Sequence, residues 1–75
     1  MNTINEKTIY ILAERVLNRR QELGLTQEEL AYKCDLDRTY ISLIERGKIN
    51  PSFTHLLKLC IGLNTSLSNL AKDIY

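Results

Sequence analysis

The sequence has few of the residues from which catalytic and metal sites are usually built. Its 75 residues include one histidine and two cysteines. Cys34 and Cys60 are not part of a CxxC motif, so a zinc site is not expected, and His55 has no obvious partner. The chain also lacks a glycine-rich phosphate loop and a nucleophile elbow. We therefore expect a protein that is not an enzyme and that needs no metal, cofactor or small-molecule ligand.

Long apolar runs are also missing. No stretch approaches the roughly 18 residues that a transmembrane helix requires, and the polar N-terminus, MNTINEKTIY, has no signal-peptide pattern. We therefore expect a cytoplasmic protein that binds no membrane, in which Cys34 and Cys60 are buried free thiols. The formal net charge of +1 says little about nucleic acid, because the distribution of charge matters more than its sum.

What the sequence does contain is helical periodicity, with no strand signal. Its 44% hydrophobic and 25% charged residues fit one small globular domain over residues 1–75, without linkers or repeats. Apolar residues recur at helical spacing from about Glu6 to Leu23, and Gly24 is a stop signal. Ser52 and Ser66 are expected to cap two further helices. Their predicted apolar faces are Phe53, Leu56, Leu57, Cys60 and Leu63, and Leu67, Leu70, Ala71 and Ile74.

Between these segments, residues 26–47 read TQEELAYKCDLDRTYISLIERG and predict two short helices. Thr26 and Glu29 form a capping box that starts the first. Asp37 is expected to cap the second through its carboxylate, and Gly47 can take the left-handed conformation that ends it. Two short helices joined by a tight turn form a helix-turn-helix, whose second helix enters the major groove of DNA. The sequence thus predicts an all-α domain of five helices.

The second of these helices has two distinct faces. Tyr40, Ile41 and Ile44 cluster on one side of the helical wheel and predict a core-facing surface. Two arginines, two hydroxyls and one leucine fall on the other side, and this mixture suits the edges of base pairs. Any surface helix also turns polar residues outward, so the exposed face alone does not establish DNA binding. Its members are Arg38, Thr39, Ser42, Leu43 and Arg46.

The pattern R-x-x-x-G-L-T-Q-x-x-L-A, then I-S-x-x-E-x-G, then N-P-S covers most of the chain. It resembles the lambda-repressor-like (XRE) family of DNA-binding domains, and LDRTYIS followed by IER resembles controller proteins of restriction–modification systems. The resemblance implies a homodimeric transcription regulator that binds a palindromic operator in double-stranded DNA and regulates its own gene and the endonuclease gene. The alternatives are an antitoxin of a toxin–antitoxin pair, or a phage or mobile-element repressor. The sequence differs from that of some family members at two places. Leu43 stands where they have a small residue, and the following loop supplies only Lys48 where some controllers also have an arginine. The resemblance therefore does not imply an operator sequence.

The family pattern gives several exposed residues an expected role. Arg38 is expected to read guanine through O6 and N7, whereas Thr39 and Ser42 contact bases or backbone. Gln27 either binds a phosphate at a helix N-terminus or is an exposed helix former. The Tyr40 ring packs, and its hydroxyl either reaches a phosphate or serves packing only. The full expected DNA-binding set is Gln27, Arg38, Thr39, Tyr40, Ser42, Leu43, Arg46 and Lys48, with Arg46 and Lys48 as phosphate clamps.

Two further expectations concern how the DNA-binding helix is held and paired. The resemblance implies an ion pair between Arg20 and Glu45 that ties the first helix to the recognition helix. One recognition helix covers few base pairs, so a dimer on half-sites roughly 34 Å apart is expected. The C-terminal helices have more apolar residues than one stripe needs, although these residues can also simply close the core. The expected two-fold interface consists of Leu59, Ile61, Leu63, Ile74 and Tyr75.

Overall fold

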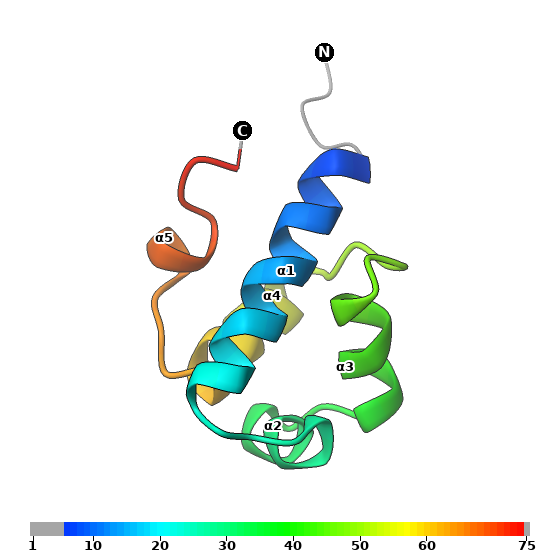
Figure 1. The fold of residues 1–75 in the computed structure, drawn as a ribbon, viewed down its shortest axis with the longest axis vertical. Helices are drawn as coiled ribbons and strands as arrows, with labels where there is room; N and C mark the ends of the chain where they lie inside the picture. The colour runs from blue at the N-terminus through cyan, green and yellow to red at the C-terminus, as the bar shows by residue number, and fades with distance from the viewer. Residues whose placement is uncertain (1–5, 75) are drawn as a thin grey trace.

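The computed structural model describes residues 6–74, and within this range it contains five helices and no strand. The helices are α1 (Glu6–Glu22), α2 (Gln27–Cys34), α3 (Arg38–Glu45), α4 (Phe53–Gly62) and α5 (Leu67–Leu70). Figure 1 shows α1 along the length of the molecule, with α3 on one side, α5 on the other and α2 across one end. This confirms the predicted all-α fold. No helix among residues 6–74 has the length and apolar character needed to span a membrane.

Every helix contributes to one core. Val16 of α1, Leu30 of α2 and Ile41 of α3 are completely buried, and so is Leu59 of α4. Cys34 and Cys60 are buried free thiols, as expected. The apolar faces of α1, α2 and α3 therefore meet at this centre, and α3 has its opposite face outward. The buried cluster is Leu12, Val16, Leu30, Ala31, Cys34, Ile41, Ile44, Leu59, Cys60, Leu63 and Leu70.

Three of the four predicted side-chain caps are present. The Thr26 hydroxyl accepts from the Glu29 backbone N–H (3.0 Å), and the Glu29 carboxylate accepts from the Thr26 N–H (2.8 Å). Ser52 and Ser66 likewise cap α4 and α5. The prediction for Asp37 is wrong in one respect: the residue occupies the N-cap position of α3, but its side chain makes no capping hydrogen bond. Asp37 is exposed, so water can solvate its carboxylate instead.

The last helix is shorter than the apolar spacing predicted. α5 ends at Leu70 with Ala71 as its C-cap, and Asp73 has a left-handed φ of 59°, so the segment after Leu70 does not continue the helix. Ile74 nevertheless packs partly against the core. The apolar repeat in residues 71–74 therefore reports burial of an irregular segment and not a continuing helix.

Gly62, the last residue of α4, is required by packing and not by a positive φ. Its φ is not in the left-handed region, whereas Asn64 two residues later has a φ of 50° and ends the turn. A Cβ on Gly62 would collide with the Cys34 sulfur and lie 3.1 Å from the Cys34 backbone nitrogen. Glycine is therefore needed here because α2 and α4 approach each other closely.

Two arginines of α1 hold the C-terminal part of the chain. Arg19 donates from Nε to the carbonyl oxygen of Leu63 (2.9 Å) and from Nη2 to that of Asn64 (3.1 Å). Arg15 donates from Nη1 to the carbonyl oxygen of Leu70 (3.1 Å). These carbonyls lie at the ends of α4 and α5, where helical partners run out. Both guanidiniums thus serve the fold.

Candidate nucleic-acid interface

The two helices of the predicted helix-turn-helix are joined by three residues. Asp35 takes the left-handed conformation after α2 with φ 55°, and the Leu36 N–H bonds back to the Ala31 carbonyl (2.9 Å). Ile41 and Ile44 of α3 are buried against α1 and α2. The predicted helix-turn-helix is therefore present, and the outer face of α3 is left uncovered beside the end of the molecule that α2 closes (Figure 1).

The outer face of α3 presents the side chains that the helical wheel predicted. Arg38, Thr39 and Arg46 are exposed, and Ser42 and Leu43 are half-buried. Within residues 6–74, the Arg38 guanidinium has no hydrogen-bond or ion-pair partner, so all five of its N–H donors are available. Arg46 Nε only reaches back to the Ser42 carbonyl oxygen (3.3 Å). Lys48 extends the basic edge into the following loop, where it is exposed.

The predicted ion pair between Arg20 and Glu45 is confirmed, and it is bidentate. Arg20 Nε and Nη2 donate to the two carboxylate oxygens of Glu45 at 2.6 and 3.0 Å, and Nη1 donates to the Leu25 carbonyl (2.8 Å). Only 14% of the Arg20 side chain and 4% of the Glu45 side chain are exposed. Because both charged groups are largely shielded from water, the loss of either side chain would leave the other charge buried without a partner. The pair fixes the C-terminal end of α3 to α1.

Gln27 joins this pair and does not project freely into solvent. Its Nε2 donates to Glu45 Oε1 at 2.9 Å, and the residue is half-buried. As the first residue of α2, after the Thr26 cap, it still lies at the positive end of a helix. The amide is thus oriented by the Arg20–Glu45 pair, and a second amide hydrogen remains for another acceptor.

Tyr40 and His55 form a contact that the sequence did not reveal. Tyr40 Oη lies 2.7 Å from His55 Nδ1, and the rings meet edge to face with centroids 4.6 Å apart. His55, for which the sequence shows no obvious partner, is thus hydrogen-bonded to a residue 15 positions earlier in the chain. Burial raises the pKa of the Tyr40 hydroxyl, against a smaller opposing effect of a hydrogen bond from the Ser52 backbone, so the phenol stays protonated at neutral pH.

The residues expected at a subunit interface differ in their exposure. Leu59 and Leu63 are completely buried in the monomer core, so they have no surface to offer a partner, and the expectation for these two is wrong. Ile61 is 76% exposed and Ile74 is half-buried, whereas Tyr75 lies outside the described residues. Phe53 and Leu57, expected in the core, are instead 64% and 40% exposed. With Ile61 they form an exposed i, i+4, i+8 stripe along α4.

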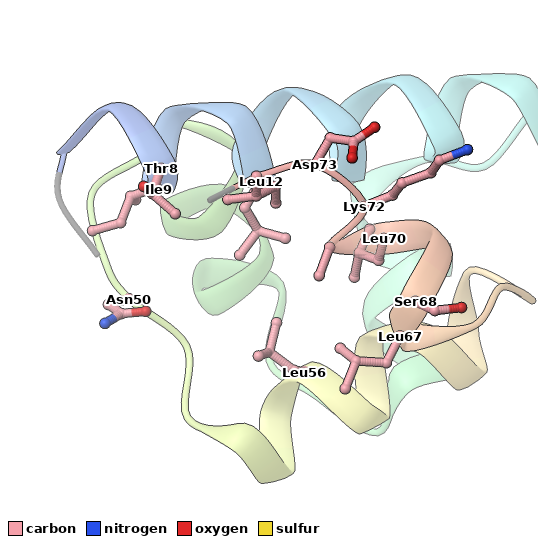
Figure 2. Close-up of a pocket in the computed structure, with 12 residues that line it drawn as sticks. Thr8, Ile9, Leu12, Asn50, Leu56, Leu67, Ser68, Leu70, Lys72 and Asp73 are labelled. Carbon is pink, nitrogen blue, oxygen red and sulfur yellow. The ribbon is translucent and has the colours of Figure 1, made fainter. Parts of the chain in front are cut away.

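An apolar groove of about 690 Å³ lies between α1, α4 and the C-terminal segment. Figure 2 shows Leu12, Leu56 and Leu67 directed into it from three different helices. Ile74 also lines it, but no residue of α2 or α3 does. The groove is therefore separate from the exposed face of α3.

Comparisons with known proteins agree with this geometry. A family model described as helix-turn-helix matches residues 16–70. Control protein C.MunI from Mycoplasma sp is 48% identical over 56 residues, which cover 75% of this chain and 76% of that protein. Control protein C.SmaI from Serratia marcescens is 43% identical over 60 residues, or 80% and 71% of the two chains.

Two solved structures have the same fold. The restriction-modification controller protein C.AhdI from Aeromonas hydrophila matches with a TM-score of 0.80 and 35% identity, over 83% of this chain and 94% of that one. The controller protein C.Esp1396I, solved as a tetramer with its natural 35 base-pair operator, matches with a TM-score of 0.81 and 37% identity, over 89% and 88%.

Proposed function

Because this chain belongs to the helix-turn-helix family, we propose that it is a DNA-binding transcription regulator, the controller protein of a restriction–modification system. The observation that carries the proposal is the outer face of α3, where the exposed Arg38 has no partner within residues 6–74. The same helix is fixed to α1 by the ion pair between Arg20 and Glu45. Rigidly held, unpaired donors are what base reading requires. The likeness to two control proteins favours a controller over an antitoxin or phage repressor.

In this proposal α3 lies in the major groove and reads bases. Arg38, in its first turn, donates two hydrogen bonds to O6 and N7 of a guanine. Thr39 and Ser42 offer hydroxyls to neighbouring bases or to the backbone, and Leu43 contacts a thymine methyl. These contacts specify the sequence, whereas contacts to phosphates fix the position of the domain on the duplex.

The positioning contacts come from the ends of the helices. Arg46 and Lys48 bind phosphates at the C-terminal side of α3, and Tyr40 reaches a phosphate through its hydroxyl. Gln27 donates its second amide hydrogen to a phosphate at the N-terminus of α2, where the helix dipole favours an anion. The first amide hydrogen stays on Glu45, so base reading and phosphate binding share one support.

We further propose that the chain acts as a homodimer on a palindromic operator, with residues 1–75 as a single domain. Ile61 and Ile74 remain from the expected interface, together with Tyr75, and the exposed Phe53 and Leu57 extend it along α4. Regulation of its own gene and of the endonuclease gene takes place in the cytoplasm and needs no catalysis by this chain.

DNase I footprinting on the DNA upstream of the chain's own gene tests the function. The expected result is a protected palindrome whose half-site centres lie about one helical turn, roughly 10 base pairs, apart. A shuffled duplex of the same composition is the control. Equal affinity for the upstream fragment and the shuffled duplex would overturn the proposal.

A further inference from the structure

The hydrogen bond between Tyr40 and His55 links the recognition helix to the first turn of α4. His55 is held there because its backbone N–H donates to the capping Ser52 hydroxyl at 3.2 Å. Tyr40 is half-buried, and its ring is fixed edge to face against the imidazole. The Tyr40 hydroxyl is therefore placed by α4 as well as by its own helix, at the margin of the face that is proposed to bind DNA.

The direction of the hydrogen bond between Tyr40 and His55 depends on which imidazole nitrogen carries a hydrogen. A phenol has one hydrogen to donate, and its oxygen can also accept. When the imidazole hydrogen is on Nε2, Nδ1 is an acceptor. The Tyr40 hydroxyl must then donate its hydrogen to Nδ1, which lies 2.7 Å from Tyr40 Oη. When Nδ1 carries a hydrogen, the direction is reversed: His55 donates, and the Tyr40 hydrogen is released. Only the second arrangement leaves Tyr40 able to donate to a phosphate oxygen.

We propose that His55 is a positioning residue for DNA binding, which donates from Nδ1 to Tyr40 Oη and thereby turns the Tyr40 hydrogen towards a phosphate of the operator. The proposal rests on the proposed function, because it concerns the same DNA-binding face. His55 itself is half-buried behind Tyr40 and acts through it.

This arrangement couples DNA binding to protonation. A protonated imidazole always has a hydrogen on Nδ1, whereas a neutral one divides between two tautomers. A phosphate beside Tyr40 also attracts the imidazolium charge. Operator binding therefore takes up a proton at His55, and affinity rises as pH falls through the range in which histidine titrates, about pH 8 to 5.5.

The titratable and charged side chains on the elements next to His55 include a tyrosine, two lysines, an arginine and an aspartate. Tyr40 faces it from α3, and Lys58, one turn along α4, pairs with Asp35 at the end of α2 (3.7 Å). Arg38 and Lys48 are exposed on α3 and in the loop before α4. Side chains of these types normally keep their charge between pH 5.5 and 8, so a change in affinity there reports on histidine. His55 is the one histidine of the sequence.

The test measures the dissociation constant for the upstream promoter fragment from pH 5.5 to 8 at constant salt. The wild-type protein is expected to bind about five- to tenfold more tightly at the lower pH, the size of one phosphate hydrogen bond. Tyr40→Phe, which lacks the donor, and His55→Asn, which hydrogen bonds but does not titrate, are both expected to give flat profiles. Arg46→Ala is the matched control: it binds more weakly at every pH but keeps the wild-type slope.

A double-mutant cycle gives an independent readout. If His55 acts through Tyr40, His55→Phe weakens binding at pH 6 in the wild-type background but has no further effect in Tyr40→Phe. Additive losses, or a wild-type pH profile in His55→Asn, would overturn the proposal. These outcomes differ from failure of the proposed function, which would show as equal binding of promoter and shuffled DNA by the wild-type protein.

Discussion

Arg20 and Glu45 are 25 residues apart in the chain, yet their side chains form a bidentate ion pair in which both are largely buried. The pair links α1 to the recognition helix, and Gln27 adds α2 to it. Three helices therefore share one carboxylate. Any displacement of Glu45 changes the orientation of α3 relative to the rest of the domain.

Replacement of Glu45 by alanine is expected to lower the free energy of unfolding by about 3 kcal/mol, because it leaves the Arg20 charge buried without a partner. Promoter affinity should fall with it, since the end of α3 is no longer fixed. Chemical denaturation and DNA titration measure the two effects. Glu22→Ala is the control, because it removes the exposed Arg19–Glu22 pair and should cost about 0.5 kcal/mol or less. Unchanged stability and affinity in Glu45→Ala would contradict the role of the pair.

Arg38→Ala is expected to abolish discrimination between the promoter fragment and shuffled DNA, at a cost of about 1–3 kcal/mol for the lost bidentate contact. Non-specific binding should change much less. Arg46→Ala and Lys48→Ala should instead weaken both kinds of binding and reduce the salt dependence of log K by about 0.9 per lost phosphate contact. If Arg38→Ala weakens binding to both DNAs equally, Arg38 contacts phosphate and does not read a base.

Gly62→Ala is expected to destabilise the domain although alanine is the better helix former. The new Cβ would collide with the Cys34 sulfur and crowd the Cys34 backbone, and such overpacking costs about 1–3 kcal/mol. The gain in helix propensity, about 1 kcal/mol, offsets part of this. Thermal unfolding of Gly62→Ala, Cys34→Ala and the double variant measures the coupling. The double variant should be more stable than the sum of the single losses; strict additivity would show that the sulfur is not the obstacle.

Cys34 is expected to resist thiol reagents in the folded protein. Desolvation by burial raises the pKa of its thiol to about 11, so at pH 8 it is almost entirely the unreactive thiol. The folded state therefore prefers the protonated form, and the free energy of unfolding should fall as pH rises from about 9 to 11. Thiol-labelling rates at pH 8 with and without denaturant check the first point. Rapid labelling of Cys34 without denaturant would contradict its burial.

The short-range features of the fold could be predicted from sequence, and the long-range ones only in part. The Thr26–Glu29 capping box could be predicted because its partners are only three residues apart. Its hydrogen bonds therefore do not depend on how the helices pack against one another. In α4, by contrast, apolar residues occur nearly all round the helix, so periodicity could not choose the buried face. In the folded chain Leu59 faces the core and Phe53 faces outward, and Gly62 on the same helix lies against Cys34 of α2. The contact between Tyr40 and His55 likewise depends on how α3 meets α4, which no local pattern records.

Ile61 is predicted to lie in the subunit interface. Ile61 is 76% exposed and forms a stripe with Phe53 and Leu57, so Ile61→Glu should leave the monomer folded, with a change in stability of about 0.5 kcal/mol or less. A carboxylate in a two-fold apolar interface meets its own copy or apolar surface, so the dimer should dissociate. Sedimentation measures the mass, and titration with one half-site and with the full palindrome measures the loss of paired binding.

Tyr32→Glu is the matched control for this experiment, because Tyr32 is 88% exposed on α2 and lies outside the predicted interface. It should remain a dimer in sedimentation at the concentrations where Ile61→Glu is a monomer. The wild-type protein should prefer the full palindrome over a single half-site much more strongly than Ile61→Glu does, since only a dimer engages both half-sites at once. A folded Ile61→Glu protein that stays dimeric and keeps the wild-type preference would show that the subunits meet through another surface.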